Sequence, residues 1–292
     1  MTAAEETAAA PEARGRGLLR RLLRHRLFVT GVVLFGLMLA LAVFADVLAV
    51  AAPERMHTRF RFRGPGWPFP LGTDNFGRDM WSRLVYGARL SLGIGFAVVV
   101  LAGVAGTAVG LVAGYFRRLD EPLMRVMDAL MAFPAILLAI AIAAALGPSA
   151  VNAVIALSVV YAPRTARIVR STVLVVREME YVQAALAFGA RHRWIVMRHV
   201  LPNSLAPLIV QLTFIFAYAV LAESILSFLG VGPPPPTPTW GNMIAEGKDY
   251  LREAPLLALF PGIAVMLTAL GLNLLGDGLR DVLDPRLRVQ HD

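Results

Sequence analysis

Few residues of this chain have the types and spacing that covalent or metal chemistry requires. The single lysine, Lys248, is followed by Asp249, whereas a phosphate-binding loop needs Ser or Thr directly after its lysine. His192 and His199 are seven residues apart on one face of an expected helix and could approach a common metal ion, although a solvated or partner-facing pair is the expected arrangement. The chain has no cysteine, which excludes disulfides and thiolate ligands. We therefore expect no catalytic residue, no cofactor and no metal site.

Polar side chains inside the apolar runs are the next candidates, because a charge in hydrocarbon is costly. Asp46 and Glu223 are expected near the outer membrane interface. Asp128 is expected near the start of its helix, where the helix dipole favours a carboxylate. The set is too sparse for the chain of ionisable groups that a proton-driven carrier needs. Its members are Asp46, Asp128, Asn152, Gln211, Glu223 and Asn273.

A charged segment between two long apolar runs, Glu180 to Asn203, has the most informative pattern in the chain. Its first part favours a short helix, on which Gln183, Ala184 and Ala185 present a small, flat face. Gly189 then permits a tight bend that residues with a side chain disfavour.

The second part of this segment, from Arg191 to Val200, predicts another short helix, with Arg191 and Arg193 beside Trp194. Leu201-Pro202 ends it, and proline is favoured at the start of the helix that follows. The result is a helix–turn–helix elbow. Taken by itself, the elbow could dock in a groove of another protein or lie on the lipid surface.

The composition is that of an integral membrane protein. The 292 residues are 57% hydrophobic and 16% charged, with a mean hydropathy of +0.64, against about 45–50% and about 25% for soluble domains. The net charge of +8 is expected next to anionic lipid rather than nucleic acid, because the arginines stand at the ends of apolar runs.

A membrane helix needs about 20 apolar residues, and six runs qualify, which predicts an all-α polytopic protein. The fourth is the weakest, because Arg164 and Arg167 interrupt its C-terminal end, and their side chains could snorkel to the interface or face a wet cavity. Six crossings put both termini on one side, and the bias of basic residues places that side in the cytoplasm, despite an arginine-rich first loop. The runs are 27–50, 90–115, 124–146, 150–170, 204–228 and 256–276.

Glycine and proline positions predict how these helices pack and bend. Gly106, Gly110 and Gly114 are four residues apart and form a flat strip that lets another helix approach closely. Three prolines inside apolar runs, Pro134, Pro207 and Pro261, should bend their helices.

The long connection from Gly230 to Pro255 contains four consecutive prolines, Pro233 to Pro236, which favour a stiff extended path. Trp240 follows them and is expected at the water–lipid interface.

The elbow resembles the EAA motif of the permease subunits of bacterial ABC importers, which reads roughly E-A-A, three residues, G and a later L-P. Here the pattern is Gln183-Ala184-Ala185, Gly189 and Leu201-Pro202. Gln183 stands in place of the leading Glu, so it cannot form a salt bridge there but can still form a hydrogen bond.

More specifically, the chain is similar to the C-type permease of dipeptide, oligopeptide and nickel importers. Several independent segments carry this resemblance in the right order, and only about the first 20 residues lie outside it. They are Leu71 to Asp79, Ser82-Arg83, Tyr86 to Arg89, Glu223 to Gly230, Pro238 to Gly241, Leu275 to Asp281 and Asp284 to Arg286.

The resemblance implies a MetI-like type I ABC importer permease fold with no ATP hydrolysis on this chain. The implied organisation is a cytoplasmic tail over 1–26, a first transmembrane helix over 27–50, an extracytoplasmic loop over 51–89, a permease core over 90–280 and a cytoplasmic tail over 281–292. The core contains an ATPase-coupling segment over 178–202. Its implied coupling residues are Glu180, Gln183, Ala184, Ala185, Gly189, Arg191, Arg193, Leu201 and Pro202.

The resemblance also implies the partners. They are a homologous B-type permease in a heterodimer, two cytoplasmic ATP-binding subunits, an extracytoplasmic substrate-binding protein and the lipid of a bacterial inner membrane, with no nucleic acid. Peptide is the default cargo, while nickel, glutathione and oligosaccharide stay open. A secondary transporter or channel is the alternative outside this class, and it would ignore ATP. A membrane enzyme would need a catalytic cluster that the sequence lacks.

Overall fold

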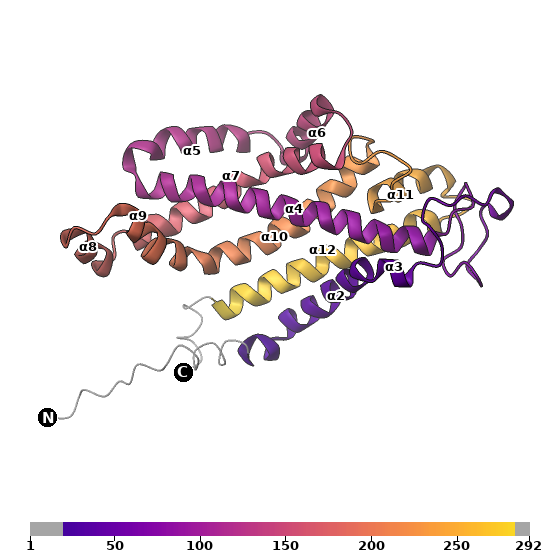
Figure 1. Cartoon of the computed structure of the whole chain (residues 1–292), viewed down its shortest axis with the longest axis horizontal. Helices are drawn as coiled ribbons and strands as arrows, with labels where there is room; N and C mark the ends of the chain where they lie inside the picture. Colours follow the sequence, from indigo (N-terminus) through magenta and orange to yellow (C-terminus); the bar gives the residue numbers. More distant parts are fainter. Residues whose placement is uncertain (1–19, 284–292) are drawn as a thin grey trace.

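The computed structural model describes residues 20–283, and within them every regular element is a helix. The long helices lie side by side along the longest axis of the molecule (Figure 1). They are α2 (Arg26–Val43), α4 (Met80–Tyr115), α7 (Ala150–Val176), α10 (Leu201–Phe228) and α12 (Leu256–Leu283). The expected Asp284-Pro285-Arg286 motif and most of the two expected tails lie outside the described residues.

Four helical stretches are long and apolar enough to cross a membrane: α2, α4, α12, and the stretch from His192 to Phe228 that includes α10. A bent pair, α5 (Arg117–Met131) and α6 (Ala135–Leu146), counts as a fifth if it forms one span. The helix α7 is not among them, because its arginines lower its mean hydropathy. The expected number of six transmembrane spans therefore stays a prediction.

The expected third span, 124–146, is not one helix. Its two halves, α5 and α6, meet at an angle of 90°. Pro134 is the N-cap of α6, because its ring removes a backbone donor and the helical ladder cannot continue through it. Pro207 and Pro261, in contrast, lie inside α10 and α12, which continue through them.

The helix α4 begins at Met80, so residues 80–89 of the expected loop 51–89 are helical. The Asp79 carboxylate caps this helix by accepting from the Ser82 backbone N–H at 2.8 Å. At about 1.5 Å per residue the 36 residues of α4 span about 54 Å, well beyond a hydrocarbon core of about 30 Å. This helix therefore extends out of the membrane.

The bundle has two differently built ends (Figure 1). At one end lie α8 (Glu180–Ala187), α9 (His192–Ile195) and the π-helical turn η2 (Val196–Val200). At the opposite end lie the irregular loop 51–79 and the segment 229–255 with α11 (Trp240–Gly247), which we call the distal cap.

Both ends of the described chain lie at the α8–α9 end of the bundle (Figure 1). The start of α2 packs against the end of α12, where a Cβ built at Gly278 would lie 2.7 Å from the Phe28 nitrogen. His25 and Asp281 approach to 3.3 Å at the same place. Because α2 and α12 pack against each other, the two ends of the described range, 20–283, share one side of the bundle.

Candidate functional site: the coupling segment and the helices behind it

The turn between α8 and α9 is a Schellman motif centred on Gly189. The Ala190 N–H donates to the Ala185 carbonyl at 3.0 Å, and the Gly189 N–H donates to the Leu186 carbonyl at 2.9 Å. Gly189 has a φ of +79°, in the left-handed region that favours glycine. The expected bend at this position is therefore present.

One side of the coupling segment is anchored in the bundle. Val182, Ile195 and Val200 are fully buried against apolar side chains of α7 and α10. On the other side the segment presents large apolar side chains to the surroundings: Phe188 is 92% exposed, Trp194 52% and Met197 58%. The segment thus combines a fixed base with an uncovered apolar tip.

Polar contacts fasten the same base to the ends of α4 and α7. Gln183 donates from its side-chain amide to the Arg177 carbonyl at 2.8 Å, at the C-terminus of α7. The Arg177 guanidinium donates to the Gly114 carbonyl at 2.9 Å, at the C-terminus of α4. His192 Nδ1 lies 2.8 Å from the Tyr115 hydroxyl. The elbow is therefore tied to two long helices as well as to α10.

The remaining predicted coupling residues lie on the open side of this segment or at its junction with α10. Glu180, Ala184, Arg191 and Arg193 are exposed, and Ala185 is half-buried. Within residues 20–283 no ion pair involves Glu180 or either arginine.

Leu201 and Pro202 begin α10 without a break from η2, in a helical stretch that runs from His192 to Phe228. Pro202 has no N–H and its ring crowds the carbonyl four residues earlier. The turn before it widens to a π-helix, where the Leu201 N–H donates to the Val196 carbonyl. The proline thus opens α10, as expected, but it joins the elbow to the membrane helix rather than separating them.

The predicted packing glycines lie on the face of α4 that meets α7. A Cβ built at Gly106 would lie 2.6 Å from the Ala162 carbonyl oxygen, and one built at Gly110 would lie 2.6 Å from the Ala166 carbonyl oxygen. At Gly114 the Val173 Cβ would be 2.7 Å away. All three separations are shorter than side chains tolerate, so only glycine allows this approach of the two helices.

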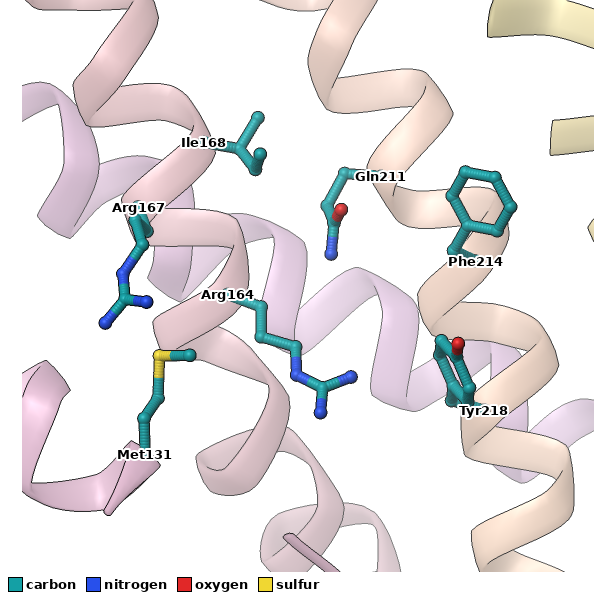
Figure 2. Close-up of a pocket in the computed structure, with 7 residues that line it drawn as sticks. All are labelled: Met131, Arg164, Arg167, Ile168, Gln211, Phe214 and Tyr218. Carbon is teal, nitrogen blue, oxygen red and sulfur yellow. The ribbon is translucent and has the colours of Figure 1, made fainter. Parts of the chain in front are cut away.

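A cavity of about 460 Å³ lies between α5, α7 and α10 (Figure 2). Arg164 points into it toward Tyr218, while the guanidinium of Arg167, which also borders the cavity, points away from Tyr218 (Figure 2). Arg167 instead pairs with Asp128 at 2.6 Å. Asp128 lies three residues from the end of α5, so the prediction that it lies near a helix start is wrong, and Arg167 rather than a helix dipole stabilises its charge.

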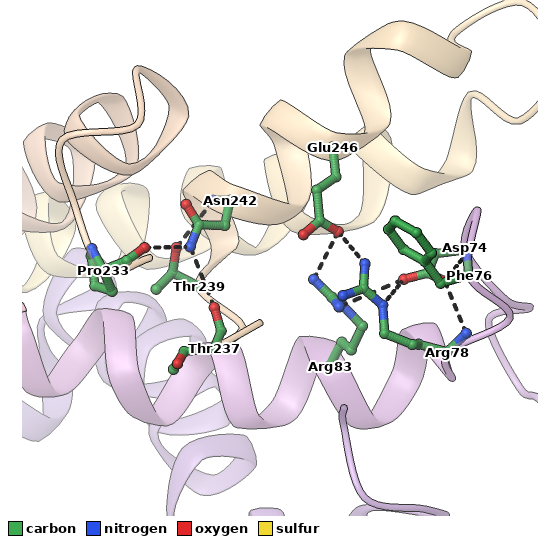
Figure 3. A network of polar contacts seen from close by, with 9 residues as sticks. All are labelled: Asp74, Phe76, Arg78, Arg83, Pro233, Thr237, Thr239, Asn242 and Glu246. Carbon is green, nitrogen blue, oxygen red and sulfur yellow. Dashed lines mark hydrogen bonds and ion pairs between the residues drawn. The ribbon is translucent and has the colours of Figure 1, made fainter. Parts of the chain in front are cut away.

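The distal cap is held by buried charges (Figure 3). Glu246 of α11 accepts from Arg78 at 2.6 Å and from Arg83 at 2.9 Å. Asp74 accepts from the backbone N–H of Arg78 at 2.9 Å and lies 3.6 Å from Arg83. Both guanidinium groups are about 2% exposed or less, so the motif from Leu71 to Asp79 serves to join the loop to α11.

Trp240 is fully buried and donates its indole N–H to the Leu84 carbonyl at 3.1 Å. Its predicted position at the lipid interface is therefore wrong, because α11 folds back and places the ring against α4. The proline run before it also turns, at residues 235 and 236, instead of staying extended. Asn242 holds this path by donating to the Pro233 carbonyl at 2.8 Å (Figure 3).

The two intramembrane carboxylates expected near the outer interface both lie toward the distal cap. The exposed Asp46 carboxylate accepts from the Arg89 guanidinium at 3.0 Å and from the Tyr86 hydroxyl at 2.8 Å. Glu223 is fully buried in the last third of α10 and accepts from the Ser227 hydroxyl at 2.7 Å. Among residues 20–283 no group of three His, Cys, Asp or Glu side chains could hold a metal ion, His192 and His199 included.

Arg164 lines a cavity, which is one of the two environments expected for it from the sequence, whereas the contacts of Arg177 and Tyr115 were not expected. A signal for the arginines was present, because Arg164, Arg167 and Arg170 follow each other at a spacing of three and share one side of α7. Two of them pair with α5, Arg167 with Asp128 and Arg170 with Asp120. The contacts of Arg177 and Tyr115 depend on the fold and have no local pattern.

The described residues form a helical membrane bundle with a broken helix, a tightly packed glycine face and an elbow at one end, and the comparisons with known proteins identify this class of protein as a transporter permease. The family model for the binding-protein-dependent transport system inner membrane component matches residues 106–289. A second model, the N-terminal transmembrane domain of oligopeptide transport permease C, matches residues 14–65. The chain belongs to this family of bacterial inner-membrane permeases.

Curated relatives agree with this assignment. A putative peptide transport system permease protein of Brucella abortus is 55% identical over 93% of this chain and 92% of its own length. The dipeptide transport system permease protein DppC of Alkalihalophilus pseudofirmus is 44% identical over 94% and 90%. The glutathione transport system permease protein GsiD of Pectobacterium atrosepticum is 40% identical over 92% and 90%.

The fold is also found among solved structures. An inward-facing structure of the MetNI methionine ABC transporter contains a chain that superposes with a TM-score of 0.57 at 23% identity, covering 70% of this chain and 97% of that one. The fold class is therefore that of a MetI-like ABC permease.

Proposed function

We propose that this chain is the C-type permease of an ATP-driven peptide importer and that two cytoplasmic ATPase subunits drive it through the coupling segment 178–202. The observation that carries the proposal is the uncovered apolar tip around Phe188, which stands on a base fixed to α4, α7 and α10. Large exposed apolar groups at the end of a membrane bundle suit a protein partner. The resemblance of the segment to the EAA motif indicates that this partner is an ATPase subunit.

The contacts of the coupling segment support a role as a rigid lever that moves the membrane helices. ATP binding closes the two ATPases, and the elbow moves with the ATPase on which it docks. Because Gln183 and Arg177 join the elbow to α7 and α4, that movement reaches the long helices. The helices then open the pathway, shared with a homologous B-type permease, toward the extracytoplasmic side. Coupling of ATP binding to the opening of the pathway requires contacts that differ between the ATP-bound and the ATP-free state of the transporter.

In this arrangement the elbow and both chain termini are cytoplasmic, and the distal cap faces an extracytoplasmic substrate-binding protein. The start of α2 and the end of α12 lie at the elbow end, which supports this orientation (Figure 1). Peptide is the proposed cargo, because relatives covering nearly the whole chain are named as peptide and dipeptide permeases.

Replacing Gly189 with valine tests the lever. A left-handed conformation costs a residue with a side chain about 1–2 kcal/mol, so the turn should reshape although no atom lies within 4 Å of the new Cβ. We expect peptide uptake to fall at least tenfold while ATP hydrolysis by the assembled complex persists. Gly189→Asn, which tolerates this φ, should retain uptake.

The matched control is Gly36→Val, at a site on α2 that also has nothing within 4 Å but an ordinary helical φ. It should transport as the native chain does. Unimpaired, tightly coupled uptake by Gly189→Val would refute the lever, and uptake that proceeds without any ATPase would refute the importer assignment.

A further inference from the structure

The cavity between α5, α7 and α10 contains a guanidinium without a charged partner. Within residues 20–283 Arg164 takes part in no ion pair and no hydrogen bond to a side chain or carbonyl. Arg167 and Arg170, on the same side of α7, are both paired with carboxylates of α5. Of the three arginines, Arg164 is thus the one left free to bind something else.

Aromatic rings hold this side chain in place. The Arg164 guanidinium carbon lies 5.7 Å from the centre of the Tyr161 ring and 5.6 Å from that of Tyr218. Stacking of this kind stabilises the cation and fixes its direction, but it does not neutralise its charge. Figure 2 shows the guanidinium directed into the space between α7 and α10, with Gln211 and Tyr218 on the α10 side.

The depth of the site makes the free charge costly. Arg164 is in the middle of α7, and Gln211 and Tyr218 are in the middle of α10. An ionised side chain at this depth lies in a wet cavity or is compensated by a ligand. The cavity volume of about 460 Å³ falls within the range of about 300–1,000 Å³ typical of small-molecule sites.

We infer that Arg164 binds the carboxylate of the transported peptide inside the membrane pathway, with Gln211 and the Tyr218 hydroxyl as the adjoining polar contacts. This inference rests on the proposed function and names the part of the substrate that the permease itself recognises. A planar guanidinium matches a carboxylate with two parallel hydrogen bonds, and a peptide with a free C-terminus supplies that group.

A carboxylate of the partner permease is the competing occupant. The lining favours a substrate, because three polar groups converge on one space while Met131, Ile168 and Phe214 form apolar walls. Close contacts between membrane helices instead use small residues, as α4 and α7 do at Gly106 and Gly110.

The test compares a dipeptide with its C-terminal amide on the complete transporter in nanodiscs, without the binding protein. Saturation-transfer NMR titrations give the Kd of each compound, which reports on the site whether or not transport occurs. We expect Arg164→Gln to raise the Kd of the free acid by tenfold or more, about the effect of losing a charged hydrogen bond, and to leave the amide unchanged. Arg164→Lys, which keeps the positive charge, should restore part of the preference for the free acid over the amide.

Arg167→Gln is the control. Arg167 also borders the cavity, but its guanidinium points away from Gln211 and Tyr218 and is paired with Asp128, so this variant should leave both Kd values unchanged. Equal effects on acid and amide, or no effect on either, would overturn the inference. Loss of the partner permease from the Arg164→Gln complex would also overturn it and assign Arg164 to a subunit contact. Absence of ATP-dependent uptake by the native complex would count against the proposed function alone, because the Kd values from the titrations still show whether Arg164 binds the carboxylate.

Discussion

The side-chain amide of Gln183 donates a hydrogen bond of 2.8 Å to the main-chain carbonyl oxygen of Arg177. The EAA motif that the elbow resembles has glutamate at this position, and an ionised glutamate side chain has no proton to donate. The glutamine thus satisfies one of the carbonyl groups that the end of α7 leaves open. Its substitution for glutamate exchanges an acceptor for a donor at the base of the elbow.

Gln183→Glu should loosen α8. The variant loses one hydrogen bond, worth about 1 kcal/mol, and places a carboxylate against the negative end of the α7 dipole. Amide hydrogen exchange in α8 should accelerate about fivefold, as measured by mass spectrometry on the purified transporter. Arg193→Gln, at an exposed site on α9, should leave α8 exchange unchanged. Equal protection of α8 in Gln183→Glu and the native chain would contradict this account.

Gly110→Ala should destabilise the bundle. The added methyl would lie 2.6 Å from the Ala166 carbonyl oxygen and 2.8 Å from the Val169 Cβ, and a backbone atom cannot move aside alone. Overpacking of this kind costs about 1–3 kcal/mol, so thermal unfolding in detergent should occur several degrees lower. The same substitution at Gly262, where nothing lies within 4 Å, should not lower the Tm. A native-like Tm for Gly110→Ala would show that α4 and α7 are not tightly apposed.

Trp240→Ala should release the distal cap. Removal of a fully buried indole costs about 3–5 kcal/mol, and α11 loses its hydrogen bond to Leu84. Limited proteolysis should cut the segment 229–255 much faster than in the native chain. Trp67→Ala removes the same side chain where it is 87% exposed and should leave the cleavage rate unchanged. Comparable rates for the two variants would show that Trp240 does not hold the cap.

Glu246→Gln should weaken the link between loop 51–79 and α11. Arg78 and Arg83 would keep a single carboxylate, Asp74, between two buried guanidinium groups. Breaking a buried ion pair by removing one partner costs about 3–5 kcal/mol, and less here because the Glu246 side chain is 23% exposed. A lower Tm is expected. Glu253→Gln, at an exposed site on the same segment, supplies the baseline, and equal Tm values for both variants would argue against this network.

Much of the architecture could be predicted from local pattern. The apolar runs locate the long helices, and the glycine spacing identifies the face of α4 on which α7 lies. The Gly189 turn needs only the chemistry of a left-handed residue. These features depend on residues close in sequence, for which periodicity and conformational preference carry the information.

The incorrect predictions share a cause, because each depends on a partner distant in sequence. Trp240 has the composition of an interface residue, yet it is buried because α11 returns to α4. Asp128 lies in a polar helix whose charges pair with the arginines of α7, and the break at Pro134 separates that helix from α6. For Arg164 a cavity was one of the two environments predicted, and only the residues that line this cavity with it depended on the positions of α5 and α10.

The uninterrupted length of α4 limits which motions this permease can make. One end of that helix carries Arg83, which binds Glu246, and the other carries Gly114, whose carbonyl binds Arg177. A single rod that reaches both surfaces transmits tilt, so the two ends cannot shift independently. The π-helical turn η2 and the 90° break between α5 and α6 lack this continuity, so we expect relative displacement of the helices to occur there rather than within α4.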